Sequence, residues 1–283
     1  MKYSVLSFCF LLTSTFFLVL PLSASSDPEI LKMVFVPASE KGDVSDYESL
    51  ISIISERAKV QIEPIKVVDY NAAVEAMRAN RAHIAWYGGK TYIKAAEIAN
   101  AEAFAAGVRK GDSNAGYYAY FVVPADSPIK ELKDIKGKTL SLNSIGSTSG
   151  DLIPRVEIKK AGLHVNDFKN IVYAGSHDAC MLAAINKQAD VCGMSSRNFD
   201  ARIADGTIKS SDIRIIHRSP LVPPPPLAYS TKLSQELRDR IKRATLEAHK
   251  FGKIGGYGGE MSHYIEVVDS DYDSLRAIDR LLN

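Results

Sequence analysis

The chain has 283 residues, of which 46% are apolar and 24% are charged, and its formal net charge at pH 7 is +2. A near-neutral chain without basic clusters lacks the concentrated positive face that nucleic-acid binding requires, so we expect no nucleic-acid partner. The length suits one large or two modest domains. Three cysteines are too few for a disulfide-dense scaffold.

Residues 1–26 have the order of a secretory signal. Lys2 precedes an uncharged apolar run over 5–22, and a patch of small residues follows. The run is also long enough for an uncleaved membrane anchor, but the small residues favour cleavage near Ala24-Ser26. We therefore expect a cleaved signal peptide and an exported protein.

From residue 31 on, apolar patterns alternate between the spacing of strands and that of helices. The strands are predicted at 31–36, 60–68 and 83–87, and the helices at 47–58, 71–80 and 91–98. This alternation predicts a mostly parallel sheet that is covered by helices on both faces. Ligands of such sheets bind beyond the carboxyl ends of the strands, which here are residues 37–39, 69–70 and 87–89.

The pattern restarts in the second half of the chain. Two further strands, 103–108 and 116–123, precede a break at 124–128. After the break, strands are predicted at 139–142, 169–173, 189–193 and 213–217, with helices at 151–161 and 179–186. Four consecutive prolines at 223–226 cannot continue a helix or a central strand and favour an extended segment.

These elements predict an α/β protein of two lobes, one inserted into the other. The first lobe is expected to comprise residues 27–123 plus 224–283, and the second residues 124–223. Two crossings between the lobes would leave a cleft, with hinges near residues 122–124 and 221–226.

Two cysteines lie beyond the signal segment. Cys180 opens a predicted helix and Cys192 lies in the next predicted strand. The antiparallel return of the chain could bring them level, and an oxidising compartment permits a disulfide. The alternative is two separate buried thiols, which is our expectation because free cysteine behaves as a small buried apolar residue.

Residues 139–150 predict an anion site. A short strand is followed by the run Gly-Ser-Thr-Ser-Gly at 146–150 and then by a helix start. The first amides of a helix lack partners within the helix, and the helix dipole adds about half a positive charge there. Three consecutive hydroxyls can donate further hydrogen bonds to a tetrahedral oxyanion. The alternative is that Ser147 or Ser149 only caps the helix.

Several motifs occur together in an order that resembles a known family. They are His-Ile-Ala-Trp-Tyr-Gly at 83–88, Gly-Ser-Thr-Ser-Gly at 146–150, Ala-Gly-Ser-His-Asp-Ala at 174–179, Asn-Lys-Gln-Ala-Asp-Val at 186–191 and Ser-Pro-Leu-Val-Pro at 219–223. This order resembles the phosphonate-binding, periplasmic substrate-binding component of an ABC transporter over nearly the whole mature chain. The resemblance implies a two-lobed type II periplasmic binding protein that closes over a phosphonate, phosphite or phosphate. It also implies a permease as the partner and the only contact with the membrane.

The resemblance implies a set of site residues as well. Those expected to hold the phosphonate oxygens or to face the cleft are Ser147, Thr148, Ser149, Tyr47, Tyr87 and His177. Neither a catalytic residue nor a metal ion nor a cofactor is implied. For Trp86 we expect packing in the core.

Two positions depart from family members that take aminoalkyl phosphonates. Those members hold the ligand's amine with acidic residues, whereas this chain has Arg197 and Pro225 there, and neither can neutralise an ammonium. We therefore expect phosphite, methylphosphonate, phosphate, or a phosphonate with a second acidic group that Arg197 could pair. The alternative is that Arg197 points into solvent.

Two other functions have to be weighed. A ligand-presenting receptor for a membrane sensor would have the same sequence features. A hydrolase would use Ser147 or Ser149 as nucleophile, His177 as base and Asp178 as its orienting partner, but the middle of the 146–150 run is not the serine of a nucleophile elbow. We therefore do not expect an enzyme.

The run Gly-Gly-Tyr-Gly-Gly at 255–259 could suggest a phosphate loop. It lacks a preceding strand and the Lys-Ser/Thr pair that would follow in such a loop. We expect a flexible turn there.

Overall fold

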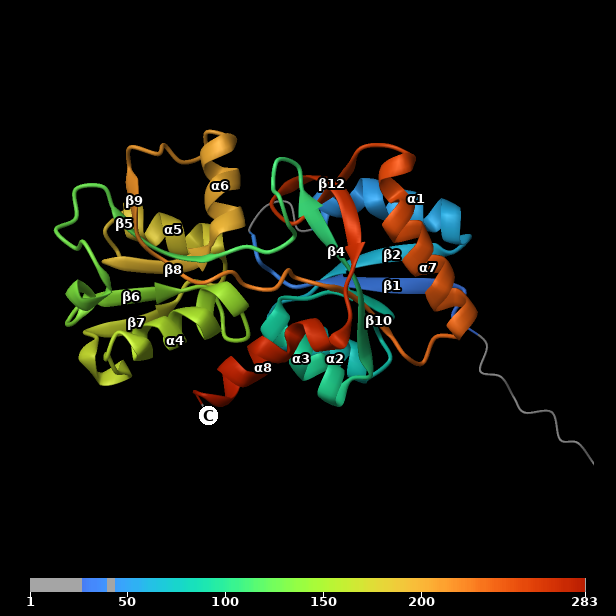
Figure 1. Cartoon of the computed structure of the whole chain (residues 1–283), viewed down its shortest axis with the longest axis horizontal. Coiled ribbons are helices and arrows are strands. Elements are labelled where there is room, and N and C mark those ends of the chain that lie inside the picture. The colour runs from blue at the N-terminus through green and yellow to red at the C-terminus, as the bar shows by residue number, and fades with distance from the viewer. Residues whose placement is uncertain (1–26, 40–43, 283) are drawn as a thin grey trace, which may run out of the picture.

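The computed structural model describes residues 27–39 and 44–282. They form two α/β lobes that lie side by side and are joined by two crossing segments (Figure 1). The predicted signal peptide at 1–26 lies outside the described residues. Within the described part of the chain, no helix is both long and apolar enough to cross a bilayer.

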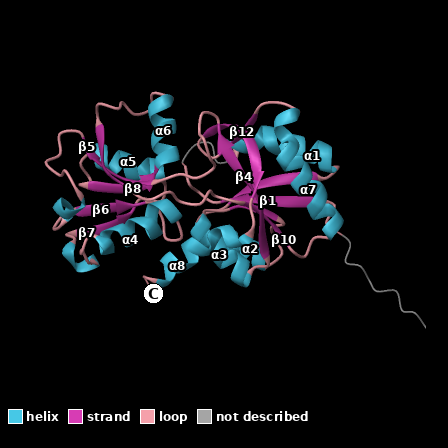
Figure 2. Ribbon diagram, in the orientation of Figure 1, coloured by secondary structure: helices cyan, strands magenta, loops and turns pink. Residues whose placement is uncertain are grey.

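The first lobe is built on a seven-stranded sheet with the order β11-β12-β4-β10-β3-β1-β2. Strand β1 pairs in parallel with β2 and β3, whereas β10 pairs antiparallel with β3 and β4. The strands are β1 (Ile30–Phe35), β2 (Gln61–Lys66), β3 (Ile84–Trp86), β4 (Ala101–Arg109), β10 (Leu227–Ser230), β11 (Ile254–Gly256) and β12 (Gly259–Glu266). The helices are α1 (Glu48–Ala58), α2 (Tyr70–Arg78), α3 (Gly89–Ile98), α7 (Gln235–Glu247) and α8 (Asp273–Arg280). Figure 2 shows them on both faces of the sheet.

The second lobe has a five-stranded sheet with the order β7-β6-β8-β5-β9. Strand β6 pairs in parallel with β7 and β8, and β5 pairs antiparallel with β8 and β9. The strands are β5 (Ala119–Pro124), β6 (Thr139–Leu142), β7 (Asn170–Tyr173), β8 (Val191–Ser195) and β9 (Ile213–Arg218). The helices are α4 (Ile153–Lys160), α5 (His177–Ile185) and α6 (Ser196–Ala204).

Strand β5 corrects the expected course of the chain. The sequence placed residues up to 123 in the first lobe, but β5 belongs to the second sheet, so the chain has already crossed before residue 119. The alternation of a strand tells which face is buried, not which sheet the strand joins. The second crossing leads from β9 through the four prolines to β10. Tyr117 and Val222 form an antiparallel bridge where the two crossings meet.

The apolar core of the first lobe continues across the interface. Leu152, Ile153 and Val156 of the second lobe are buried in the same cluster as the strands of the first lobe. The two lobes are therefore in contact, as in the closed state of a binding protein.

The two cysteines form a disulfide, so the expectation of separate thiols is wrong. The Cα atoms of Cys180 and Cys192 lie 5.6 Å apart and their sulfurs are bonded. The first turn of α5 lies directly over β8, which brings the two side chains level at the buried face of the sheet. Sequence spacing alone could not show this packing.

Candidate ligand-binding site between the lobes

The Ser-Thr-Ser loop (residues 147–149) lies in the cleft, directly after β6. Ser147 caps a π-helical turn over Thr148–Leu152, and its Oγ accepts a hydrogen bond from the Gly150 N–H at 3.1 Å. The same Oγ accepts the side-chain N–H of Asn143 at 3.3 Å. These contacts use the lone pairs of the Ser147 hydroxyl, so its proton stays available for an anion. Capping and anion binding are thus compatible roles.

Thr148 connects the loop to the first lobe. Its Oγ1 accepts the backbone N–H of Lys90, the second residue of α3, at 2.9 Å. The neighbouring Thr91 hydroxyl donates to the carbonyl oxygen of Gly146 at 2.9 Å. Helix α3 therefore begins at the Ser-Thr-Ser loop, and helix starts from both lobes converge on it. This arrangement concentrates N–H groups and positive dipole ends at one point.

A Cβ atom on Gly88 would lie 3.1 Å from Thr148 Oγ1. This distance is tighter than most contacts of a real Cβ, so a glycine just before α3 allows the close approach of the two lobes.

Two tyrosines that were not among the expected site residues, Tyr117 and Tyr70, form hydrogen bonds at the site. The hydroxyl of Tyr117, on the first crossing, hydrogen-bonds to the side chains of Ser149 and Thr148. The hydroxyl of Tyr70, at the start of α2, accepts the side-chain N–H of Asn143 at 3.2 Å. Both tyrosine side chains are buried. Tyr70 lies at one of the strand ends where ligand binding was expected, and Tyr117 lies at the start of the predicted strand 116–123, but the sequence does not show that their side chains point to the site.

Tyr87 does not reach the Ser-Thr-Ser loop, contrary to the expectation. Its hydroxyl donates to the carbonyl oxygen of Ala73 at 3.2 Å, within the first lobe. The residue follows β3 directly, and its side chain lies on the face that packs against α2. Burial raises the pKa of its phenol well above the usual value. The structure thus gives Tyr87 a packing role.

Tyr47 lies in the cleft wall, beside the loop rather than on it. Its ring packs against Phe35 and Trp86, with ring centroids 4.9 and 5.9 Å away. Its hydroxyl accepts the backbone N–H of Tyr257 at 3.1 Å. Trp86 is buried in the core, as expected.

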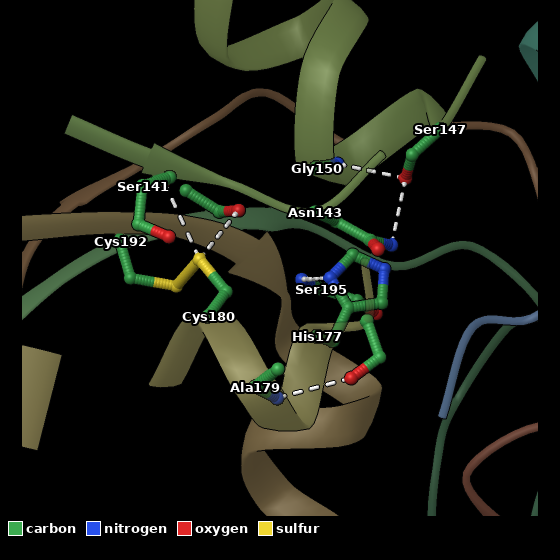
Figure 3. Close-up of a disulfide and its surroundings, with 11 residues drawn as sticks. Ser141, Asn143, Ser147, Gly150, His177, Ala179, Cys180, Cys192 and Ser195 are labelled. Atoms are coloured by element: carbon green, nitrogen blue, oxygen red, sulfur yellow. Dashed lines mark hydrogen bonds between the residues drawn. A yellow bond between two sulfur atoms is a disulfide. The ribbon is translucent and has the colours of Figure 1, made fainter. Parts of the chain in front are cut away.

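His177 faces the Ser-Thr-Ser loop from the first residue of α5 (Figure 3). Its Nδ1 accepts the backbone N–H of Ser195 at 3.3 Å. Burial lowers the pKa of His177 to about 3, although the nearby carboxylate of Asp178 raises it. The ring is therefore neutral, and its proton lies on Nε2, where it can be donated to a ligand. A Cβ on Gly150 would lie 2.8 Å from Cε1 of this ring, so a glycine is needed where the histidine meets the turn.

The disulfide supports this histidine. Cys180 lies in the first turn of α5, three residues after His177, and Cys192 lies in β8, three residues before Ser195. Figure 3 shows the disulfide next to both segments. The bond therefore ties together the two elements that hold the imidazole.

Asp151 lies in the same turn, but its charge is compensated. Its Oδ2 accepts from Nζ of Lys90 at 2.7 Å, and its Oδ1 from Nε of Arg155 at 2.8 Å. Burial alone would raise the pKa of Asp151, yet Lys90, Arg155 and the Tyr173 hydroxyl together hold it below its ordinary value. The loop is therefore not exposed to an uncompensated carboxylate.

Arg197 points into the protein and not into solvent. The residue is 2% exposed, and its guanidinium donates to the carbonyl oxygens of Ala115, Gly107 and Tyr257 at 2.7, 3.2 and 3.4 Å. Its Nε is buried without a partner in the described part of the chain. Burial lowers the pKa of Arg197. Among the described residues its hydrogen bonds go to carbonyl oxygens and no carboxylate forms an ion pair with it, so the cation favours negative charge nearby.

Arg197 and Pro225, the two positions that depart from the family pattern, line one small cavity. It has room for about one water molecule, about 10 Å³ for the centre of a water-sized sphere. The lining residues are aromatic or apolar apart from one arginine, and no carboxylate is among them: Tyr47, Trp86, Arg197, Pro225, Tyr257 and Tyr264, with three others.

Comparison with known proteins gives a consistent family. The family described as "ABC transporter, phosphonate, periplasmic substrate-binding protein" matches residues 33–272. The chain is 34% identical to the phosphonates-binding periplasmic protein of Escherichia coli over 187 residues, which are 64% of this chain but only 55% of that protein. It is 25% identical to a phosphate-import protein of Mycolicibacterium smegmatis over 278 residues, 90% of this chain and 87% of that one.

Solved structures show the same fold. A binding component of an ABC phosphonate transporter from Pseudomonas aeruginosa has a TM-score of 0.79 at 23% identity and covers 90% of this chain and 87% of its own. A Prochlorococcus marinus protein in complex with methylphosphonate also has a TM-score of 0.79, at 20% identity, and covers 91% of this chain and 99% of its own. The expected fold, a two-lobed type II periplasmic binding protein, is confirmed. The chain belongs to the family of periplasmic substrate-binding proteins of phosphonate ABC transporters.

Proposed function

We propose that the protein captures a small tetrahedral phosphorus oxyanion, namely phosphite, methylphosphonate or phosphate, in the cleft between its lobes. The observation that carries the proposal is the ring of buried neutral donors around the Ser-Thr-Ser loop. The donors are the hydroxyls of Ser147, Thr148 and Ser149, the phenol of Tyr117 and the Nε2–H of His177. Hydrogen bonds from fixed donors to an ionised oxygen are roughly twice as strong as neutral ones.

The cavity supports a ligand with a small and non-cationic group on phosphorus. An aminoalkyl group would need a carboxylate partner for its ammonium, and the lining of the cavity offers only the Arg197 guanidinium. The two cations would repel one another in a buried site. We therefore expect 2-aminoethylphosphonate to bind more weakly than methylphosphonate.

The proposed ligand would favour closure of the lobes. Donors come from the second lobe in the loop and α5, and from the first lobe and the crossing in Tyr70 and Tyr117. A ligand that contacts both lobes shifts the equilibrium toward the closed state. The closed protein would then deliver its ligand to the permease of the transporter. The family is periplasmic, and the sequence of residues 1–26 supports export with cleavage near Ala24-Ser26.

Hydrolysis is not part of the proposal. Asp178 does not orient the imidazole of His177: its carboxylate accepts from the Ser39 hydroxyl at 2.8 Å and from Nε of Arg202 at 3.1 Å. The histidine Nδ1 instead faces a backbone N–H. A serine nucleophile would therefore lack the base and orienting group of a triad.

Calorimetric titration of the mature protein tests the proposal with phosphite, phosphate, methylphosphonate and 2-aminoethylphosphonate. We expect binding of at least one of the first three and a weaker response to the fourth. Ser149→Ala should lower the affinity roughly tenfold, because one hydrogen bond to a charged group is lost. Tyr87→Phe is the matched control, since its hydroxyl bonds within the first lobe. An absence of heat with all four ligands would exclude the proposed function.

A further inference from the structure

The glycine-rich run at 255–259 is a packed hairpin and not the flexible turn expected from sequence. Strands β11 and β12 pair through Gly256 and Gly259, and Tyr257 and Gly258 form the tip between them. Gly258 has a φ of +85°, and a Cβ there would lie 2.9 Å from the Cβ of Arg197. The glycine thus allows the tip to press against α6 of the second lobe.

Tyr257 extends from this tip across the cleft. Its hydroxyl donates to the side-chain oxygen of Asn198 and also hydrogen-bonds with Ser195, and both partners belong to the second lobe. Its carbonyl oxygen accepts from the Arg197 guanidinium at 3.4 Å. Its own N–H donates to the hydroxyl of Tyr47 at 3.1 Å, which fixes the tip on the first lobe. A single residue therefore holds both walls of the cleft.

The ring of Tyr257 occupies the space next to the anion site. Its centroid lies 4.8 Å from that of Trp86 and 6.4 Å from that of Tyr117. Tyr117 in turn hydrogen-bonds to Ser149 and Thr148, so Tyr257 and the Ser-Thr-Ser loop both lie next to the same tyrosine. Burial, together with Tyr117 and Tyr70 nearby, raises the pKa of the Tyr257 phenol well above its usual value. What remains of the space around this ring holds about one water molecule.

We propose that Tyr257 determines ligand specificity by limiting the size of the group on phosphorus, an inference that rests on the proposed function. With the ring in place, the chamber accommodates hydrogen, hydroxyl or methyl. A longer or aromatic group has to displace the ring, which breaks the hydrogen bonds to Asn198 and Ser195 and holds the lobes apart. Large ligands are thus rejected through loss of closure.

Binding of methylphosphonate and phenylphosphonate to the mature protein and its variants tests this inference. We expect the wild type to prefer methylphosphonate, and Tyr257→Ala to reduce that preference roughly tenfold or more, because apolar space for several carbon atoms opens. Tyr257→Phe keeps the ring and should retain the size preference while binding methylphosphonate more weakly. Tyr257→Leu, with a smaller side chain, replaces the alanine variant if thermal unfolding shows that the latter does not fold.

Ser262→Ala is the matched control on the same hairpin, because its hydroxyl donates to the Val108 carbonyl oxygen at 3.1 Å within the first lobe and the residue does not line the cavity. It should behave as the wild type does. An unchanged preference in Tyr257→Ala or Tyr257→Leu, with a wild type that binds methylphosphonate, would overturn the role of Tyr257 alone. A wild type that binds no phosphorus oxyanion would overturn the proposed function and this inference with it.

Discussion

His177 combines burial with a fixed proton position. Its Nδ1 accepts a backbone N–H and its pKa is lowered to about 3 by burial, so it is a neutral donor across the physiological pH range. A buried imidazolium would add attraction for an anion but would have to be desolvated whenever the cleft is empty. The neutral ring avoids that cost and leaves recognition to oriented hydrogen bonds.

The same burial makes folding depend on pH. An unfolded histidine binds a proton below about pH 6.5, whereas folded His177 does so only near pH 3. The unfolded state therefore binds more protons in this window, and the free energy of unfolding falls as the pH decreases. Relative to His177→Gln, we expect the wild type to lose up to about 1.4 kcal/mol per pH unit between about pH 6 and pH 4. Urea unfolding of both proteins at several pH values measures the difference.

Titration of Asp46 changes the free energy of unfolding with pH in the opposite direction. It does so equally in the wild type and in His177→Gln, so its effect cancels from this comparison. Burial raises its pKa to about 6, so the folded state binds its proton first as the pH decreases. A difference between wild type and variant that stays constant with pH would show that His177 does not titrate as stated.

Side-chain direction is the part of the site that the sequence could not supply. The Ser-Thr-Ser loop and His177 could be located because the residue types and the helix starts coincide. The tyrosines could not be assigned in the same way: Tyr87 follows its strand on the face toward α2, whereas Tyr70 and Tyr117 face the loop. A one-residue difference along the chain moves a side chain to the other face of a strand.

At the scale of elements, the disulfide joins α5 to β8 beneath the site. The closed loop is short, since the two cysteines are 12 positions apart, and it runs from the first turn of α5 to the strand β8 on which this helix packs. A crosslink of this kind restricts the unfolded chain and also fixes the two elements relative to each other.

Reduction of this bond should have two effects. We expect the free energy of unfolding to decrease by about 3 kcal/mol, as chain-entropy estimates give for short loops. Methylphosphonate affinity should also fall, because His177 and Ser195 lie three residues from the two sulfurs. Urea unfolding and calorimetry, with and without reductant, measure both, and Cys180→Ala/Cys192→Ala serves as a variant insensitive to reductant. If that variant lost affinity on addition of reductant, the effect would not come from the disulfide.

The order of the helices and strands along the chain could be predicted from the sequence better than which of them pack or pair with one another. The βα alternation gave the parallel strands β1, β2 and β3, and the small residues at 146–150 gave the start of a helical turn. Two features depend on contacts distant in sequence: β5 joins the second sheet, and the tip at 257–258 is held by Arg197 and Asn198. Neither contact leaves a local pattern, because antiparallel strands alternate alike in either sheet and glycine-rich runs also form loose turns.

On the scale of the whole molecule, the closed cleft is held by direct contacts between the lobes. Lys90 of the first lobe pairs with Asp151 of the second, and the backbone N–H of His177 donates to the Ala38 carbonyl oxygen at 3.2 Å. The proposed ligand binding would therefore be coupled to closure. Any change that populates the open state reduces the apparent affinity by the fraction of closed protein that is lost.

Variants of the Lys90–Asp151 pair measure two effects on affinity: the loss of a contact between the lobes and the influence of the Asp151 carboxylate on the anion. Lys90→Met removes this contact and leaves Asp151 with Arg155 and the Tyr173 hydroxyl, at the turn proposed to bind the anion. We expect methylphosphonate affinity to fall about tenfold, between the effects of exposed and buried ion pairs, since Lys90 is partly exposed. Lys90→Met/Asp151→Asn should recover part of the loss, because the partly compensated carboxylate is gone while the contact remains lost. A calorimetric double-mutant cycle separates the two contributions. Without recovery in the double variant, Lys90 would act through closure only, and the carboxylate would have no influence on the anion.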